Sequence, residues 1–171
     1  MTEKIVNFLV NLFGGKSSSE VIKIIIICVL SMLPVIELRG GLIAAALLNL
    51  DGVLSFILCY IFNLLPIPFI LLLIEWIFKL FRKSKLLGKI VTKMEQKVEK
   101  KRGQIDKYGY FGLFLFVAIP LPGTGAWTGA LIAALLNMNK KKSFLTIAVG
   151  VLVAGIIMMI LSYGLLKGII G

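Results

Sequence analysis

The chain has 171 residues, of which 59% are hydrophobic, and a formal net charge of +11 at pH 7. A soluble core cannot bury so much apolar surface, so the composition excludes the ordinary soluble classes and predicts one polytopic membrane domain over residues 1–171. The sequence contains no His, which excludes imidazole metal sites, and we expect neither a metal nor another cofactor.

The positive charge is unevenly distributed. Ten of the 19 basic residues lie between Arg82 and Lys107, and Lys140 to Lys142 form a second cluster. In an apolar chain such clusters mark cytoplasmic loops, because positive residues stay on the inner side of the membrane. We therefore expect a multi-pass protein of the inner or plasma membrane, with no nucleic acid as a partner.

The first apolar segments are too short to cross a membrane singly. Residues 1–19 are amphipathic and are expected to lie on the membrane interface. Residues 20–36 and 42–50 are apolar, but a helix needs about 20 residues to cross a hydrocarbon core of about 30 Å. We therefore predict a helical hairpin over 20–50 that enters the bilayer, breaks at 34–41 and leaves on the same side.

A long span and a basic segment follow. Residues 53–81 are predicted to form one transmembrane helix, bent by Pro66 and Pro68, which completes a first unit at 20–81. Residues 82–109 combine basic side chains with apolar residues at helical spacing. This pattern predicts an amphipathic helix on an anionic membrane surface, with a solvated helical linker as the alternative.

The second half has the same order of elements. Residues 110–138 are predicted to form a second hairpin, broken between Pro120 and Gly129, and residues 143–166 to form the last span. Together they make a second unit at 110–171. Polar residues at the two hairpin exits are expected to cap helices: Asn49, Asp51, Asn137 and Asn139.

An internal repeat relates the two units. Residues 34–57 match residues 122–145 at a constant offset of 88, with nine identities among the 24 pairs. Two hairpins with one span between them would place the copies in opposite orientations, an inverted repeat about an axis in the membrane plane. The predicted fold class is therefore an all-α integral membrane protein with two re-entrant hairpins, and four full spans is the alternative.

The first break carries ionisable residues between apolar runs. Placing a charge at this depth costs about 2.5–3.5 kcal/mol, so such groups are retained for a pathway or a site. Glu37 is the candidate proton-exchanging acid and Arg39 the candidate donor to phosphate or carboxylate. Gly40 and Gly41 would open the next helix, whose N-terminal amides favour an anion. An exposed ion pair in a surface loop is the alternative, and Asn63 is expected to hydrogen-bond across helices.

The second break has no charge but is rich in glycine and hydroxyl groups. Repeat symmetry would bring it opposite the first break, where unwound backbone must line a wet cavity or contact protein. Trp127 could stack on a substrate or anchor at an interface. The predicted binding residues here are Pro120, Pro122, Gly123, Thr124, Gly125, Trp127 and Thr128. A glycine-rich helix-packing element is the alternative.

Two motifs resemble those of the small multidrug export protein family of bacteria and archaea, a distant relative of the DedA superfamily. They are Glu-Leu-Arg-Gly-Gly-Leu-Ile at 37–43 and Phe-Val-Ala-Ile-Pro-Leu-Pro-Gly-Thr-Gly-Ala-Trp-Thr-Gly-Ala at 116–130. The resemblance implies re-entrant hairpins, a hairpin acid near Glu37 and, for DedA proteins, movement of lipids such as polyprenyl phosphate. DedA proteins place two arginines around a proline of the second hairpin. No arginine flanks Pro120, so anion binding would fall to Arg39.

The sequence therefore predicts a small membrane transporter, linked to protons, that moves an anionic lipid phosphate or a small amphipathic molecule. The alternatives are an exporter of lipophilic drugs and a non-transporting membrane scaffold that acts through the basic segment. No enzyme signature is present, so we expect no catalytic activity. The expected partners are membrane lipids, protons and a second copy of the chain, because one copy offers little volume for a sealed path.

Overall fold

The computed structural model describes residues 19–73, 92, 96, 108–121 and 123–165. Within these ranges all regular secondary structure is helical, as the all-α prediction requires. The predicted interfacial segment at 1–19 and the basic linker helix at 82–109 lie almost entirely outside the described residues, and both stay predictions.

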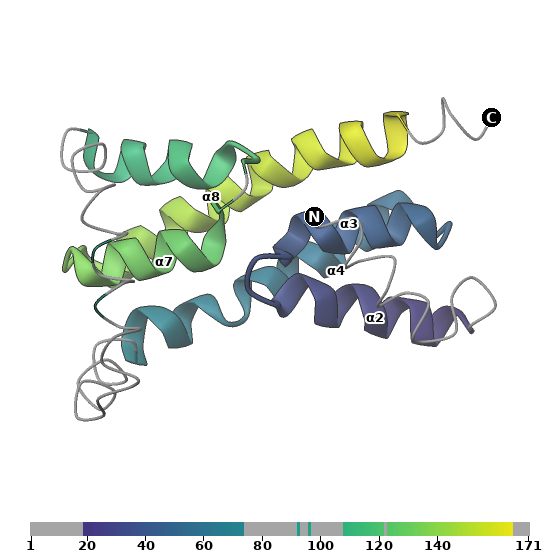
Figure 1. Cartoon of the computed structure of the whole chain (residues 1–171), viewed down its shortest axis with the longest axis horizontal. Coiled ribbons are helices and arrows are strands. Elements are labelled where there is room, and N and C mark those ends of the chain that lie inside the picture. Colours follow the sequence, from purple (N-terminus) through teal and green to yellow (C-terminus); the bar gives the residue numbers. More distant parts are fainter. Residues whose placement is uncertain (1–18, 74–91, 93–95, 97–107, 122, 166–171) are drawn as a thin grey trace.

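The first half begins with two short helices that fold back on each other. Helix α2 (Glu20–Met32) has 13 residues and α3 (Glu37–Leu47) has 11. At about 1.5 Å per residue, neither reaches across a core of about 30 Å. The helices run antiparallel and pack side by side (Figure 1). A helical hairpin is therefore present, with a turn at residues 33–36, and its entry and exit on one side of a bilayer stay a prediction.

The turn is shorter than the predicted break at 34–41, because α3 already begins at Glu37. The amide of Gly40 donates to the Ile36 carbonyl oxygen at 3.0 Å, so Gly40 and Gly41 lie inside the helix and do not open it. Their small size serves packing. A methyl group on Gly41 would overlap the Ser31 hydroxyl and would lie 2.8 Å from the Cys59 sulfur.

The two long helices follow the hairpins. Helix α4 (Gly52–Leu64) ends at a turn that contains Pro66, and the helix then resumes, so that the apolar stretch Gly52–Leu73 is 22 residues long. Pro66 has no amide hydrogen to continue the helical bonding, which explains the bend. Helix α8 (Lys140–Met159) continues into a π-helix, and the stretch Lys140–Gly164 is 25 residues long. Both stretches are long and apolar enough to cross a membrane.

The second half repeats the local structure of the first. The helix Tyr108–Ala118 starts 88 residues after α2, and α8 starts 88 residues after α4. Helix α7 (Ala126–Leu135) corresponds to α3. The turn after each of these two helices uses a residue with positive φ, 55° at Asn49 and 53° at Asn137.

The polar residues at the hairpin exits divide into two roles. The Asp51 carboxylate accepts from the Leu54 amide at 2.8 Å, and Asn139 accepts from the Lys142 amide at 3.1 Å. These are N-caps of α4 and α8, as predicted. Asn49 and Asn137 are not side-chain caps. They hold the left-handed backbone conformation that ends α3 and α7, which asparagine tolerates better than most residues.

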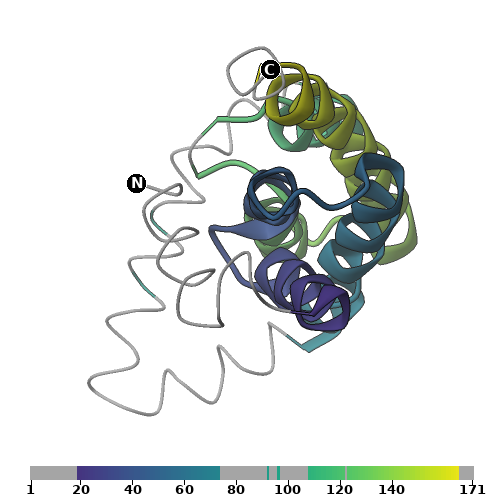
Figure 2. The ribbon, with the colours of Figure 1, turned by 90° about the vertical axis from the view of Figure 1, so that its right-hand side faces the viewer.

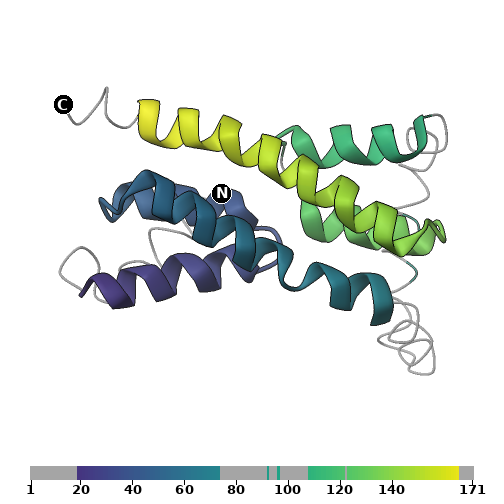
Figure 3. The same ribbon diagram turned by 180° about the vertical axis from the view of Figure 1, so that it is seen from behind.

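The two hairpins lie end to end, with their turns facing each other near the middle of the long axis (Figures 1 and 3). The long helices α4 and α8 run past both hairpins. Figure 2 shows α3 enclosed by other helices, and α3 packs against α2, α4 and α8. Eight of its 11 residues are buried.

The outer surface is apolar. On α8, a ridge of large side chains at helical spacing faces outward, with Leu145 64% exposed and Ile160 67% exposed. A soluble protein rarely exposes so continuous an apolar face, whereas a lipid bilayer would cover it. The helix lengths and this surface both indicate a membrane protein.

Candidate functional site

The carboxylate of Glu37 joins the two hairpin turns. Glu37 is the first residue of α3 and is 5% exposed. Its Oε2 accepts a hydrogen bond from the Ala126 amide and its Oε1 from the Trp127 amide, both at 3.1 Å. These amides begin α7, where backbone donors lack helical partners and the helix dipole favours negative charge. Glu37 therefore caps a helix of the other half of the chain.

Gly125 makes this cap possible. It is the N-cap residue of α7, with φ 135° and ψ −173°, a conformation that only glycine adopts readily. A methyl group at this position would overlap the Glu37 carboxylate, approaching its Cδ atom to 2.7 Å. The glycine thus allows close approach of the carboxylate to the two amides.

Arg39 binds the other side of the second turn. Its Nη1 donates to the Leu121 carbonyl oxygen at 2.6 Å. Its Nη2 donates to the Ile119 carbonyl oxygen at 3.2 Å and to the Thr124 hydroxyl at 3.1 Å. These acceptors follow the end of the helix Tyr108–Ala118, where carbonyl groups lack helical partners and a positive charge is favourable. The planar fork of arginine can bind several such acceptors at once.

Two residues of the second turn complete the contact. The Thr124 Oγ1 lies 2.8 Å from both the Ile119 and the Leu121 carbonyl oxygens, so it fixes the loop that Arg39 binds. The Trp127 indole donates from Nε1 to the Met32 carbonyl oxygen at 3.1 Å, at the end of α2. The indole nitrogen therefore joins the two hairpins, and the predicted substrate stacking or interface anchoring stays a prediction.

The predicted anion site at the start of α3 stays a prediction, and groups there already have protein partners. The Glu37 and Gly40 amides donate to backbone carbonyls, and the guanidinium of Arg39 is directed to the opposite hairpin. The alternative, an exposed ion pair in a surface loop, is wrong, because Glu37 is buried. The two charged groups have separate partners in the second turn.

The other predicted site residues are distributed around this contact. Pro120 lies in the loop that Arg39 binds, and Gly123, at φ 81°, faces open space. Thr128 is partly buried on α7, directly after Trp127. Pro122 lies outside the described residues.

Asn63 on α4 is a further functional candidate, because the tertiary structure places it beside Glu37. Its side chain is 1% exposed, and its Oδ1 has no hydrogen-bond partner among the described residues, contrary to the predicted bond across helices. It lines a cavity of about 10 Å³ together with Glu37, Arg39 and Gly125. This space holds about one water molecule, which could bridge Asn63 to the carboxylate. An asparagine inside an apolar run is the sequence signal for such a site.

Replacing Arg39 with lysine is expected to lower thermal stability by about 5 °C, which corresponds to about 2 kcal/mol for a chain of this size. Lysine keeps the charge, but its single nitrogen cannot bind three acceptors in the geometry of the guanidinium fork. Unfolding in detergent can be followed with a thiol-reactive dye, because Cys28 and Cys59 are free and buried. Arg39→Met, which has no donors, should be less stable still. A methionine variant as stable as the wild type would show that these hydrogen bonds contribute nothing.

The comparisons with known proteins agree with a transport protein. A comparison with curated proteins found no match, and neither did a comparison with solved structures. The relationship to DedA proteins therefore stays a prediction. One family model, described as "Putative small multi-drug export protein", matches residues 37–157, which begin at Glu37 and include the second hairpin turn. Because the match covers well over half of the 171 residues, the chain belongs to this small multi-drug export protein family.

Proposed function

We propose that this protein is a small, proton-linked membrane transporter, and that the contact between its two hairpin turns is the gate. The observation that carries the proposal is the capping of α7 by the buried carboxylate of Glu37, at 3.1 Å from two amides. An acid held in this way can change the contact between the two halves when it gains or loses a proton.

The helix arrangement supports re-entrant hairpins in the proposed transporter. The hairpin helices are too short to span, and their turns meet near the middle of the molecule while α4 and α8 run past them (Figures 1 and 3). The offset of 88 between two pairs of helix starts, and of 89 between α3 and α7, supports an inverted repeat in a multi-pass protein of the plasma membrane. Lys140 to Lys142 would then face the cytoplasm.

Protonation of Glu37 would weaken the gate. The ionised carboxylate accepts two charge-assisted hydrogen bonds at the positive end of α7, and these are stronger than bonds to a neutral acid. A proton on one oxygen removes the charge, so the equilibrium shifts toward a state in which the turns separate. Deprotonation on the other side of the membrane would close the contact again. The cavity beside Asn63 can hold about one water molecule, which would pass a proton to the carboxylate.

The cargo that we favour is a small amphipathic molecule, because the family description refers to multi-drug export. A lipid phosphate is the second candidate. While the two hairpin turns are in contact, the guanidinium of Arg39 donates to groups of the second turn. Separation of the turns would free this planar guanidinium, whose donors suit a phosphate. The scaffold alternative depends on the basic segment 82–109, of which the structure describes only residues 92, 96, 108 and 109, and no described contact favours it.

Replacing Glu37 with glutamine tests the proton link. In proteoliposomes that carry an imposed pH gradient, the wild type should accumulate ethidium, a lipophilic cation. The pH of the lumen, which pyranine fluorescence reports, should change at the same time. The glutamine side chain does not gain or lose a proton at ordinary pH. We therefore expect transport below about a tenth of the wild-type rate, because a positioned acid changes a rate by at least this factor. Glu37→Asp retains an acid and should keep measurable transport.

The outcomes separate the parts of the proposal. Gradient-driven transport by Glu37→Gln at the wild-type rate would exclude Glu37 as the proton carrier. No ethidium transport by the folded wild type would exclude lipophilic cations as cargo, and the same vesicles with fluorescent lipid phosphate would then test the second candidate. The thiol-dye assay confirms that each variant is folded.

A further inference from the structure

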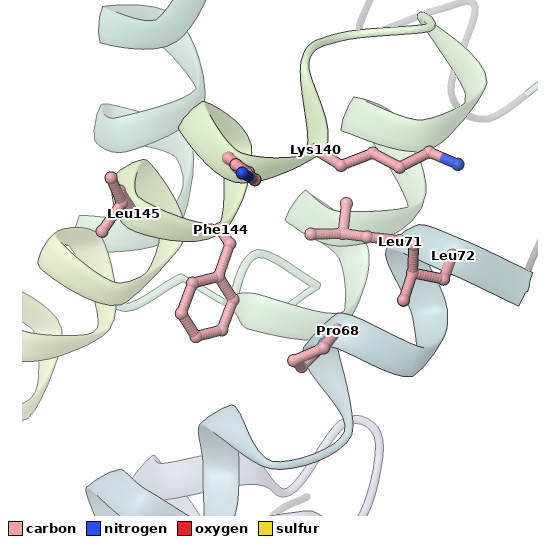
Figure 4. Close-up of a pocket in the computed structure, with 7 residues that line it drawn as sticks. Pro68, Leu71, Leu72, Lys140, Phe144 and Leu145 are labelled. Carbon is pink, nitrogen blue, oxygen red and sulfur yellow. The ribbon is translucent and has the colours of Figure 1, made fainter.

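A second site lies at a distance in sequence from the hairpin contact. An open pocket of about 410 Å³ lies between the end of the Gly52–Leu73 helix and the start of α8 (Figure 4). Its volume is within the range of about 300–1,000 Å³ that is usual for small-molecule sites. Its lining residues are Pro68, Leu71, Leu72, Lys140, Lys141, Phe144 and Leu145. None of these residues contacts Glu37 or Arg39 through a described hydrogen bond.

The pocket combines an apolar wall with a cationic edge. Phe144, Leu145 and Leu72 supply apolar side chains, and the latter two are 64% and 59% exposed. Lys140 extends along the edge of the pocket, away from Phe144 and toward the side of Leu71 and Leu72 (Figure 4). Lysine stems pack along apolar surface in this way while the ammonium group stays at the polar interface.

The lysines occupy a place that disfavours positive charge. Lys140, Lys141 and Lys142 form the first turn of α8, where the helix dipole already concentrates positive charge. Three ammonium groups in one turn also repel each other. An anion bound at the edge of the pocket would offset both effects, because it would interact with the ammonium groups and with the positive end of the helix.

We propose that this pocket binds an anionic phospholipid of the cytoplasmic leaflet, with the phosphate at Lys140 and Lys141 and an acyl chain against Phe144 and the leucines. The lysine-rich end of α8 is the cytoplasmic end by the positive-inside rule, and anionic lipids are abundant there. The apolar wall selects a lipid over a free phosphate, and the lysines select an anion over a lipophilic cation. The site anchors the protein in the leaflet and is separate from the proposed gate.

Native mass spectrometry of the full-length protein in mild detergent tests the site. The protein is mixed with equal amounts of phosphatidylglycerol and phosphatidylcholine that carry the same acyl chains. The wild type should retain phosphatidylglycerol preferentially. Removing the two pocket lysines, Lys140→Gln with Lys141→Gln, should reduce this preference by about tenfold, given the usual contribution of about fivefold per lysine near an anionic surface and partial screening.

A matched variant controls for net charge. Lys23→Gln with Lys142→Gln removes the same charge from α2 and from the same turn of α8 but leaves the pocket lysines, so the preference should persist. If both pairs of substitutions reduce the preference equally, the lipid responds only to net charge and the proposal is wrong. Equal retention of both lipids by the wild type would overturn it as well.

A second pair of variants tests the apolar wall. Leu72→Trp would fill the pocket, whereas Leu73→Trp adds the same ring at a neighbouring exposed residue that does not line it. We expect loss of retained phosphatidylglycerol only in the first variant, and unchanged retention there would exclude acyl-chain binding in this pocket. Glu37→Gln should retain lipid normally, so failure of the transport experiment and failure of the lipid experiment are distinguishable.

Discussion

The Gly125→Ala variant is expected to unfold about 10 °C below the wild type, which corresponds to a loss of about 3–5 kcal/mol. The backbone conformation at φ 135° and ψ −173° is strained by about 1–3 kcal/mol for any residue with a Cβ atom. The added methyl group would also displace the Glu37 carboxylate from the two amides of α7. Loss of hydrogen bonds to a charged group costs about 1.5–3 kcal/mol.

Gly123→Ala is the matched control for this prediction. Gly123 also has a positive φ, 81°, but a methyl group there would meet no atom within 4 Å. Only the backbone strain applies, so the expected loss is about 1–2 kcal/mol. Thermal unfolding with the thiol-reactive dye compares the two variants directly. Equal losses of unfolding free energy in both variants would show that the close approach of Glu37 to Gly125 does not contribute to stability.

The Glu37→Ala variant is expected to show the second large effect. Its free energy of unfolding should fall by about 3 kcal/mol, and it should not transport ethidium. The substitution leaves the Ala126 and Trp127 amides without their acceptor in a buried place, and an unsatisfied buried donor costs about 1–3 kcal/mol. It also removes the negative charge of Glu37, which lies two residues from Arg39 in α3. Thermal unfolding and the ethidium assay measure the two parts separately.

A double-mutant cycle between Glu37 and Gly125 distinguishes a direct contact from two independent effects. In the Glu37→Ala background, the methyl group of Gly125→Ala no longer meets a carboxylate, so only the backbone strain remains. The second substitution should therefore cost about 1–3 kcal/mol there, less than in the wild type. Strictly additive losses would mean that the two residues do not act through one contact.

The two long helices and the first hairpin could be predicted from composition and length alone. Hydropathy identified the apolar runs, and the runs shorter than a bilayer thickness predicted a hairpin before any contact was known. The extent of the first break was wrong. Two adjacent glycines were interpreted as backbone freedom, whereas Gly41 is in the helix because α2 and α4 approach it closely, with Ser31 and Cys59 against its Cα. Sequence alone does not distinguish these two uses of glycine.

The repeat was visible in sequence only over part of each unit. The turns after α3 and α7 carry identical residues, Asn49 and Asn137. Their φ angles are both positive and nearly equal, 55° and 53°. Elsewhere the offset of 88 persists in the helix starts after the side chains have diverged, as at Glu20 and Tyr108. Helix boundaries depend on hydrogen bonding and packing that many sequences satisfy, so the local structure retains the repeat better than the residues do.

By itself, the sequence determined the all-helical class, the polar caps at Asp51 and Asn139, and the choice of Glu37 and Arg39 as the charged candidates of the first hairpin. Only the tertiary structure decided what these two residues bind. Apart from the Thr124 hydroxyl, their partners are backbone amides and carbonyls 80 or more positions away, at Ala126, Trp127, Ile119 and Leu121. Backbone groups are the same in every residue, so no motif marks them as partners. Their availability depends on where a helix begins or ends and on which end of another helix lies beside it.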